Sequence, residues 1–372
     1  MRKLFAAAMI AVMAGSLVSC SKEQTATEET NKKIGLAMPT QDLERWNNDG
    51  EYLKNHFEEA GYEVELKYSQ GDATRQNNDI IGMIADGVDL LLVAPVDGDK
   101  LSKTLDEAKA KGIPVVSYDR LIMDTDAITY YISFDNYMVG KLQGEYVLDE
   151  LQIDSTSGPY NVEFVSGDPG DNNARYFFNG AYETLQSYID TGKIVVPSGK
   201  TTFERVATED WTSDNAEKDM KSRISSNYKD KQLDAVICSN DSTALGATRA
   251  VESSYKGGGN PVIIGQDGDI ENLRNIVDGK QSMTVYKNIN DEAGVALEVC
   301  KKLLAGEIPA ASLVDSLSVE CEFDTESYNN GKKYVQSYLL VPNVITKDNL
   351  QLLVNTGLYQ WDASNKYLEL VK

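Results

Sequence analysis

The sequence predicts an α/β protein made of two similar lobes, each built around a doubly wound parallel sheet. Short apolar runs alternate with amphipathic helical segments from Lys33 onward, which is the pattern of parallel strands covered by helices on both faces. The chain has 372 residues, more than a single hydrophobic core usually encloses. A pattern of polar residues at strand ends also occurs twice along the chain. Together these observations predict two lobes rather than one.

The predicted strands fall into two successive sets. The first set comprises Ile34–Met38, Val64–Tyr68, Leu90–Ala94, Pro114–Tyr118 and Ile128–Ile132. The second set comprises Asn161–Val165, Ile194–Val196, Ala235–Cys238, Val262–Ile264 and Met283–Tyr286. Gly61, Gly87 and Gly112 follow helical stretches, where glycine commonly ends a helix.

One stretch in each half of the chain has a similar pattern. Val88–Asp97 is matched by Leu233–Asp241, and the next strand in each half ends in an aspartate, Asp119 and Asp267. Ligands of open α/β sheets bind outside the carboxyl ends of the strands. We therefore expect one crevice lined by residues from both lobes: Asp119, Asn240, Asp241 and Asp267. A single aspartate after a strand is more simply a helix N-cap, but the repeated placement favours the crevice.

Composition excludes several classes of function. Lys and Arg number 36 against 58 Asp and Glu, a net charge of −22, which disfavours a nucleic-acid partner. The single histidine, His56, rules out a zinc site with two histidines within one chain. His56 lies in a predicted helix, Glu51–Ala60, whose apolar stripe favours a solvated position for it over a catalytic one. Neither phosphate-binding glycine motif is present, and Asp267–Glu271 is an incomplete calcium loop, so no cofactor or metal is expected.

The N-terminus has the pattern of an export signal. Residues 1–19 combine a basic start, an apolar run and small residues before Cys20, and the segment resembles the lipoprotein box, in which that cysteine is lipidated. An ordinary signal peptide is the alternative. Residues 20–32 are polar and aperiodic, as expected of a flexible tether. The sequence thus predicts an exported protein, lipid-anchored to the cell membrane and facing the periplasm or the cell exterior.

The other cysteines carry no predicted chemistry. Cys238 lies in an apolar strand and is expected to behave as a small hydrophobic residue. Cys300 and Cys321 could pair in an exported protein, but their spacing does not decide it.

The loops after the strands are rich in groups that suit a sugar. Carboxylates, guanidinium groups and amides match the hydroxyls around a pyranose, and indole rings match its C–H faces. The predicted set is Arg45, Trp46, Asp119, Arg120, Asp135, Asn136, Asp171, Asn172, Asn173, Trp211, Asn240, Asp241, Asp267 and Lys287. Trp46 or Trp211 alone could equally be a core residue; together, within this polar set, they favour a ligand.

An ordered series of motifs extends along almost the whole chain after the tether. It consists of Glu44–Trp46, Tyr118–Arg120, Ser133–Asn136, Asp171–Ala174, Ser239–Asp241, Gly265–Asp267, Val285–Lys287 and Ser337–Asn349. The series resembles the xylose-binding and multiple-monosaccharide-binding group of type I periplasmic binding proteins, which serve ABC importers. The chain departs from that group at Thr208–Trp211, at Pro169–Gly170 and at Asn288.

The resemblance implies two lobes joined by three crossover strands. The N-terminal lobe would comprise residues 33–135 and about 288–322, and the C-terminal lobe residues 136–287 and about 323–372. Trp46 and Trp211 would flank a sugar ring. Its hydroxyls and ring oxygen would be bound by Arg45, Asp119, Arg120, Asn136, Asn173, Asn240, Asp267 and Lys287.

The predicted function is capture of a monosaccharide, xylose or a related aldopentose or aldohexose, by lobe closure. The expected partner is the permease of an ABC importer, and the protein is expected to be a monomer without enzymatic activity. A sugar-sensing receptor subunit that signals to a chemoreceptor or sensor kinase would use the same pocket. A secreted glycosidase is a further alternative, because Asp119 and Asp267 could act as its paired carboxyl groups. A sugar-responsive repressor would need a DNA-binding helix pair where this chain has an export signal.

Overall fold

The computed structural model describes residues 32–371. The predicted signal peptide (1–19), the predicted lipidation site Cys20 and residues 20–31 of the predicted tether lie outside the described residues. Within residues 32–371, no helix has both the length and the apolar character needed to cross a bilayer.

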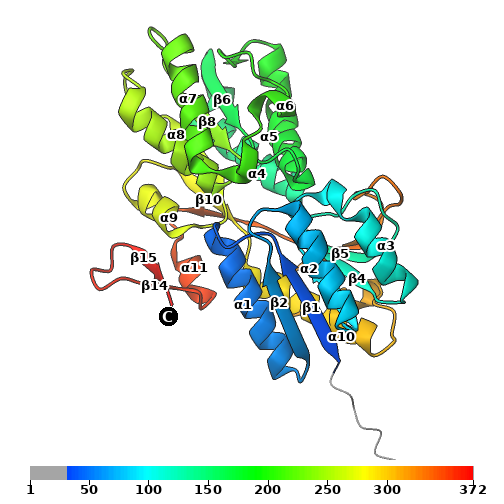
Figure 1. The fold of residues 1–372 in the computed structure, drawn as a ribbon. Helices are drawn as coiled ribbons and strands as arrows, with labels where there is room; N and C mark the ends of the chain where they lie inside the picture. Colours follow the sequence, from blue (N-terminus) through cyan, green and yellow to red (C-terminus); the bar gives the residue numbers. More distant parts are fainter. Residues whose placement is uncertain (1–31, 372) are drawn as a thin grey trace, which may run out of the picture. The chain divides into compact units, whose positions relative to one another are not determined.

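The first sheet has the strand order β11-β12-β5-β4-β3-β1-β2. Its strands are β1 (Lys33–Met38), β2 (Glu63–Tyr68), β3 (Leu90–Val93), β4 (Val115–Tyr118), β5 (Ile128–Phe134), β11 (Cys321–Asp324) and β12 (Ser337–Leu340). The helices around it are α1 (Glu44–Glu59), α2 (Ala73–Ala85), η1 (Gly98–Lys100), α3 (Ser102–Ala110), α10 (Ile289–Leu304) and η4 (Ala311–Ser316). Figure 1 shows α1 and α2 running alongside β1 and β2.

The second sheet has the order β13-β10-β9-β8-β6-β7. Its strands are β6 (Tyr160–Val165), β7 (Ile194–Val195), β8 (Ala235–Cys238), β9 (Val262–Gln266), β10 (Met283–Tyr286) and β13 (Asn343–Thr346). Its helices are α4 (Asn136–Glu150), η2 (Ile153–Ser155), α5 (Asn172–Asp190), α6 (Phe203–Val206), η3 (Glu209–Trp211), α7 (Ser213–Asn227), α8 (Asp241–Ser254) and α9 (Ile270–Val277). The chain ends in α11 (Gln351–Asn355) and the hairpin of β14 (Tyr359–Trp361) and β15 (Leu368–Leu370).

The predicted α/β class with two parallel sheets is confirmed. Among the described residues, neighbouring strands of both sheets run parallel except for the pairs β11–β12 and β10–β13. The sequence did not predict those antiparallel edges, because their strands are short and only partly apolar. One detail differs from the expected lobe boundaries. β12 pairs with β5 in the first sheet, whereas the chain after about residue 322 was expected in the second lobe.

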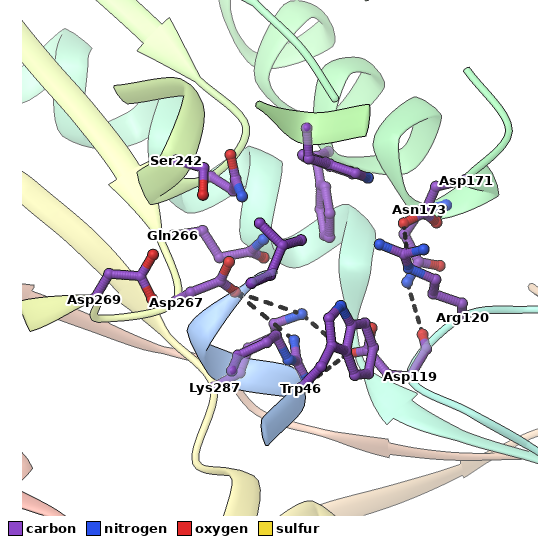
Figure 2. A pocket seen from close by; sticks show the side chains of 15 residues that line it. Trp46, Asp119, Arg120, Asp171, Asn173, Ser242, Gln266, Asp267, Asp269 and Lys287 are labelled. Carbon is purple, nitrogen blue, oxygen red and sulfur yellow. Dashed lines mark hydrogen bonds and ion pairs between the residues drawn. The ribbon is translucent and has the colours of Figure 1, made fainter. Parts of the chain in front are cut away.

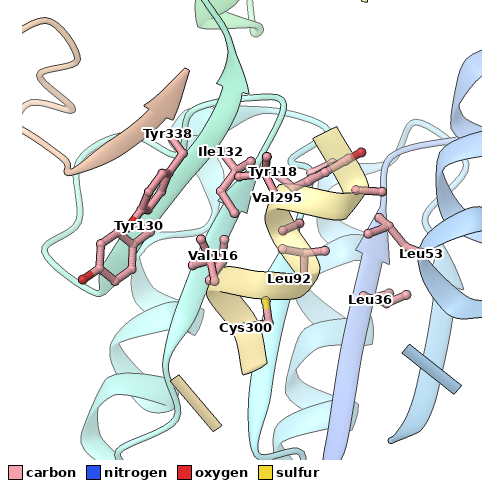
Figure 3. Close-up of a cluster of buried hydrophobic side chains, with 14 of the residues drawn as sticks. Leu36, Leu53, Leu92, Val116, Tyr118, Tyr130, Ile132, Val295, Cys300 and Tyr338 are labelled. Atoms are coloured by element: carbon pink, nitrogen blue, oxygen red, sulfur yellow. The ribbon is translucent and has the colours of Figure 1, made fainter. Parts of the chain in front are cut away.

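The first sheet is buried on both faces, which explains its continuous apolar strands. Leu36 and Leu92 belong to a core cluster with residues of α1 and α10, whereas Ala37 and Leu91 belong to a second cluster. Successive side chains of a strand point to opposite faces, so both faces must be covered. Figure 3 shows the first of these clusters, with side chains of β3, β4 and β5 packed against α10.

The cysteine predictions can now be compared with the structure. Cys238 is buried in β8, as predicted, and Cys300 is buried in the core cluster of Figure 3. Cys300 and Cys321 are free thiols rather than a pair. His56 is half-buried on α1, where its ring stacks on Tyr52 with centroids 3.8 Å apart.

A buried ionic network holds β6, the strand that leads into the candidate site. Glu163 is fully buried, and its carboxylate accepts hydrogen bonds from the Ser198 hydroxyl at 2.6 Å and the Tyr228 hydroxyl at 2.9 Å. Arg223 Nη1, also buried, lies 3.3 Å from the same carboxylate and bonds the neighbouring carbonyl of Phe164. The network therefore ties β6 to α7 and to the segment after β7.

We expect Glu163→Ala to lower the free energy of unfolding by about 3 kcal/mol, because it removes one partner of a buried charge. Urea unfolding followed by circular dichroism measures the change. Glu58→Ala is the control: Glu58 forms an exposed ion pair with Lys54, and its loss should cost less than about 1 kcal/mol. Equal effects of the two substitutions would contradict a structural role for the Glu163 network.

Candidate ligand-binding site

The carboxyl ends of strands from both sheets face one cavity (Figure 2). It holds about 440 Å³ of atom-free space, part of it open to solvent. The residues that line it are Leu43, Arg45, Trp46, Asp119, Arg120, Asp171, Asn173, Phe177, Trp211, Asn240, Ser242, Gln266, Asp267, Asp269 and Lys287. Of the residues to which the resemblance assigned a sugar contact, Asn136 is the one missing from this set. Asp135, Asn172 and Asp241, which belong to the wider predicted polar set, do not line the cavity either.

The first sheet contributes an ion-paired carboxylate to the cavity wall. Asp119 follows β4, and its Oδ2 lies 3.0 Å from Arg45 Nη2 and 3.1 Å from Lys287 Nζ. Burial alone would raise the pKa of Asp119, but Arg45, Lys287 and Arg120 outweigh it and lower the pKa to about 2. Asp119 is therefore a permanent acceptor at any physiological pH.

The second sheet contributes the facing carboxylate, Asp267. Its Oδ1 lies 3.7 Å from Arg45 Nη1 and 3.9 Å from Lys287 Nζ. Burial raises its pKa above the ordinary range, although both cations oppose that shift. Arg45 and Lys287 thus each contact both Asp119 and Asp267, and each can present N–H donors to a bound molecule.

The backbone is strained where these side chains enter the cavity. Asp119 has φ 57° and Asp267 has φ 110°, a region that favours glycine. The Asp119 carbonyl oxygen accepts hydrogen bonds from the Tyr131 hydroxyl at 2.7 Å, the Ser133 hydroxyl at 2.9 Å and the Asn173 amide at 2.6 Å. These contacts hold a conformation that the chain would not adopt by itself.

A second ion pair closes another side of the cavity. Arg120 Nε lies 2.7 Å from Asp171 Oδ2, and Arg120 Nη1 donates to the Pro95 carbonyl at 3.2 Å. Burial raises the pKa of Asp171, while Arg120 opposes the rise. Protein groups therefore hold Arg120 in place through its Nε and Nη1 atoms.

Both tryptophans are buried and also line the cavity. Each is therefore a core residue and at the same time a surface against which a ligand can lie. Trp46 is 1% exposed, and the guanidinium carbons of Arg45 and Arg120 lie 4.7 and 5.1 Å from its ring centre. Trp211 is 5% exposed and packs edge-on against Phe177. Neither indole N–H has a hydrogen-bond partner among the described residues, so each retains a donor.

Trp211 is held by an unusual turn. Asp210 and Trp211 have φ values of 57° and 56°, and Asp168 Oδ2 accepts a hydrogen bond from the Asp210 N–H at 2.6 Å. The indole lies directly over Gly167: a Cβ on that glycine would be 1.9 Å from the ring atom Cη2. The absence of a side chain at Gly167 is therefore what admits the ring.

Asn136 corrects one of the predicted ligand contacts. It is fully buried below the cavity wall, where its Nδ2 donates to the Tyr131 hydroxyl at 2.9 Å and contacts Ser133 Oγ at 3.3 Å. Its side chain lies inside the lobe because α4 begins at this residue and packs against the sheet. Asn136 supports the groups that hold the Asp119 carbonyl and does not line the cavity.

Asp241 is the second correction, because the chain repeat predicted it in the crevice. It is fully buried and does not line the cavity. Its Oδ2 accepts hydrogen bonds from the Gly268 N–H at 2.9 Å and the Asp269 N–H at 3.0 Å, which fixes the turn after Asp267. Burial raises the pKa of Asp241 to about 8.

Asn240 combines two predicted roles. Its side chain caps α8 by accepting a hydrogen bond from the Thr243 N–H at 2.9 Å, and it also lines the cavity. The helix N-cap interpretation is thus correct for Asn240 without excluding the crevice.

Five lining residues were not in the predicted polar set: Leu43, Phe177, Ser242, Gln266 and Asp269. Asp171 belongs to the predicted polar set, although no sugar contact was assigned to it. Gln266 stands next to Asp267 inside a motif of the series and could have been included. Leu43 and Phe177 gave no signal, because an apolar residue in a helix or loop looks like any core residue. They add apolar surface to a polar cavity, which suits a molecule with both hydroxyl groups and C–H faces.

Comparison with known proteins gives one family. The profile of the periplasmic binding protein domain matches residues 34–308. The multiple sugar-binding periplasmic protein SbpA of Azospirillum brasilense is 34% identical over 367 residues, covering 96% of this chain and 98% of that protein. The D-xylose-binding periplasmic protein of Escherichia coli K12 is 37% identical over 319 residues, covering 86% and 88%.

Solved structures agree with this result. A solute-binding protein of an ABC transporter from Clostridium phytofermentans, solved with bound β-D-glucose, has a TM-score of 0.83 at 44% identity and covers 90% of this chain and 99% of its own. A carbohydrate transporter solute-binding protein from Chloroflexus aurantiacus, in complex with D-glucose, has a TM-score of 0.78 at 29% identity and covers 90% and 98%.

Proposed function

Because the chain belongs to the periplasmic binding protein family, we propose that it captures a monosaccharide between its two lobes and delivers it to an ABC importer. The observation that carries the proposal is the cavity at which Asp119 of the first sheet and Asp267 of the second face each other across Arg45 and Lys287. A sugar that bridges these groups stabilises the arrangement in which the lobes meet.

The proposed ligand is xylose or a related aldopentose or aldohexose. The relatives and solved structures above are named for xylose, for several sugars or for glucose, and the cavity offers both charged groups and buried rings. Hydrogen bonds to charged groups contribute about 1.5–3 kcal/mol each. About six or seven of them, together with contacts to the indole rings, are enough to reach the roughly 8 kcal/mol of a micromolar complex after the cost of association.

We assign the sugar contacts to residues that line the cavity. Trp46 and Trp211 would lie against the ring faces. The hydroxyls and ring oxygen would be bound by Arg45, Asp119, Arg120, Asn173, Asn240, Asp267 and Lys287. In the structure the Asn173 amide already donates to the Asp119 carbonyl. We therefore assign Asn173 the smallest part in binding the sugar.

The ligand is expected to leave unchanged. A glycosidase needs one carboxyl group as a general acid and a second as base or nucleophile. Three carboxylates of the cavity, Asp119, Asp171 and Asp267, are ion-paired to Arg45, Arg120 or Lys287, an arrangement suited to binding. Incubation with aryl glycosides tests this point, and release of the aryl group would favour the enzyme.

The proposal includes export and attachment of the protein to the membrane through a lipid on Cys20. The described part of the chain begins at Lys32, and the intervening polar segment would give the protein a reach of roughly 20 Å from the membrane surface. The protein is proposed to act as a monomer. Metabolic labelling with a radioactive fatty acid, lost in Cys20→Ser, tests the anchor.

A thermal-shift screen of free aldoses tests the binding proposal. A ligand at 100 times its Kd that binds only the native state stabilises that state by about 2.7 kcal/mol. D-xylose or D-glucose is therefore expected to raise Tm by several degrees, whereas glycerol at the same concentration should not. Absence of a shift with every aldose of the panel would contradict a monosaccharide-binding role.

A further inference from the structure

Arg45 is held from behind by two buried carboxyl groups that do not line the cavity. Arg45 Nε and Nη2 donate to Asp49 Oδ2 at 3.1 and 2.9 Å, and Nη2 lies 3.4 Å from Glu292 Oε2. Asp49 and Glu292 are both 0% exposed. The same guanidinium reaches Asp119 on its other side, so it lies between the cavity and this rear pair.

The two rear carboxyl groups hold Arg45 with unequal strength. Asp49 lies four residues after Arg45 in α1, on the same helix face, and receives two hydrogen bonds on one oxygen. Glu292 comes from α10 and has one longer contact. One oxygen of each carboxyl group, Asp49 Oδ1 and Glu292 Oε1, is buried without a hydrogen-bond partner among the described residues.

The charges around Arg45 do not balance if every acid is ionised. Nη2 of Arg45 faces Asp49, Asp119 and Glu292, and Lys287 is the only other cation in ion-pair contact with any of these acids among the described residues. A buried charge without a partner is costly, so a group in this position takes up or gives up a proton. Asp119 is paired with both Arg45 and Lys287. Within the described part of the chain, Asp49 and Glu292 pair only with Arg45, so its one positive charge cannot neutralise both of them.

The directions of the pKa shifts agree with that division. Burial raises the pKa of Asp49 to about 6, with Arg45 opposing the rise. Burial, followed by the charge of Asp119, raises the pKa of Glu292 well above its ordinary value. Of the two rear carboxyl groups, Asp49 therefore holds its negative charge beside Arg45 more readily, and Glu292 keeps its proton more readily.

We propose that Asp49 is a positioning residue: when ionised it fixes Arg45 for the sugar, so that affinity falls as Asp49 takes up a proton in mildly acidic solution. Glu292 fills the space behind Arg45 without carrying charge. The proposal deepens the proposed function and rests on it, because it takes Arg45 to be a ligand of the sugar.

Tyr68, Tyr118, Asp119 and Lys287, which also lie near Asp49 or Arg45, do not account for such a change. Tyr68 of β2 has a pKa raised to about 12 by burial and by the charges of Glu51 and Asp49. Burial, together with Asp49 and Glu292, raises the pKa of Tyr118 well above its ordinary value. Asp119 stays ionised, and Lys287 supplies a positive charge that opposes protonation of Asp49. Asp267, whose pKa burial also raises, contacts Arg45 at 3.7 Å from the other side of the cavity. Substitution of Asp49 alone distinguishes these two carboxyl groups.

Calorimetric titration with D-glucose and D-xylose at pH 7.5, 6.0 and 5.0 tests the proposal. The wild-type affinity is expected to fall by about fivefold from pH 7.5 to 5.0, because a pKa of about 6 leaves roughly a tenth of Asp49 ionised at pH 5.0 and the protonated form should bind about tenfold more weakly. Asp49→Asn should bind about tenfold more weakly at pH 7.5 and show little further change at pH 5.0. Glu292→Gln, which keeps an uncharged group of the same size, should retain the wild-type pH profile.

A control variant and a sugar-independent measurement separate the possible results. Histidines commonly titrate in this range, and the chain has one, so His56→Gln must keep the wild-type profile. A pH profile that persists in Asp49→Asn, or a profile lost in Glu292→Gln, would overturn the assignment. If Asp49→Asn does not fold, the profiles of the wild type, Glu292→Gln and His56→Gln still decide between Asp49 and the other two groups.

Stability of the ligand-free protein distinguishes failure of this inference from failure of the proposed function. A carboxyl group whose pKa is higher in the folded than in the unfolded state lowers stability as pH rises from about 4 to about 6. The wild type should therefore lose stability relative to Asp49→Asn over that range, with or without a sugar. No binding of either sugar at pH 7.5 would contradict the proposed function, whereas a pH-independent stability difference would contradict titration of Asp49.

Discussion

Asp119→Asn is expected to abolish monosaccharide binding under ordinary assay conditions. The substitution keeps the size of the side chain, and asparagine tolerates the left-handed backbone at this position, where φ is 57°. It removes the charge that pairs with both Arg45 and Lys287. Removing one partner of a buried, hydrogen-bonded charge pair costs about 2–5 kcal/mol in binding, so affinity should fall by at least about 30-fold in calorimetry with D-glucose or D-xylose.

Asp124→Asn is the matched control for this substitution. Asp124 has nearly the same backbone conformation, with φ 54°, and is exposed outside the cavity. It should bind sugar as the wild type does. Normal binding by Asp119→Asn, with the fold intact by circular dichroism, would remove Asp119 from the proposed site.

The low pKa of Asp119 also sets the pH at which its negative charge, and the stabilisation that the charge provides, is lost. Because the pKa is about 2 in the folded protein and ordinarily near 3.8, the stabilising effect of its charge is complete above about pH 4. That effect disappears only as the pH falls toward 2. A loss of affinity between pH 7.5 and 5.0 therefore cannot come from Asp119.

Gly167→Ala is expected to weaken binding by at least about tenfold, although it adds only one methyl group. The new Cβ would lie 1.9, 2.1 and 2.2 Å from three atoms of the Trp211 ring, distances that packed atoms do not reach. The ring must move, and overpacking of this kind costs about 1–3 kcal/mol of stability. A displaced indole can no longer lie against a sugar face, so affinity falls and the tryptophan fluorescence changes.

Gly258→Ala is the control for the added methyl group. A Cβ at Gly258 would meet nothing within 4 Å, so neither affinity nor Tm should change by much. Unchanged sugar affinity in Gly167→Ala would show that the position of the Trp211 ring does not matter for binding. It would also remove Trp211 from the proposed contacts.

The sequence predicted those residues of the candidate site that directly follow a recognisable strand or stand in a recognised motif. Asp119 and Asp267 were recognisable because each follows an apolar strand, and Arg45 and Lys287 because they stand in motifs of the same series. Helix boundaries were less well predicted: α1 begins at Glu44 rather than Glu51. Arg45 and Trp46 therefore lie in the first turn of a helix rather than in a loop, and this places Asp49 behind Arg45.

The sequence alone determined the α/β class, the two parallel sheets and the chemical character of the groups at their carboxyl ends, because each of these follows from the order of neighbouring residues. Only the tertiary structure decided which polar residues reach the cavity: Asp267 does, whereas Asp241 and Asn136 are buried as supports. Glu292 meets Arg45 across 247 positions of the chain. Such a contact has no local pattern, since it depends on how α10 packs against α1 and on which charges lose their water when the helices meet.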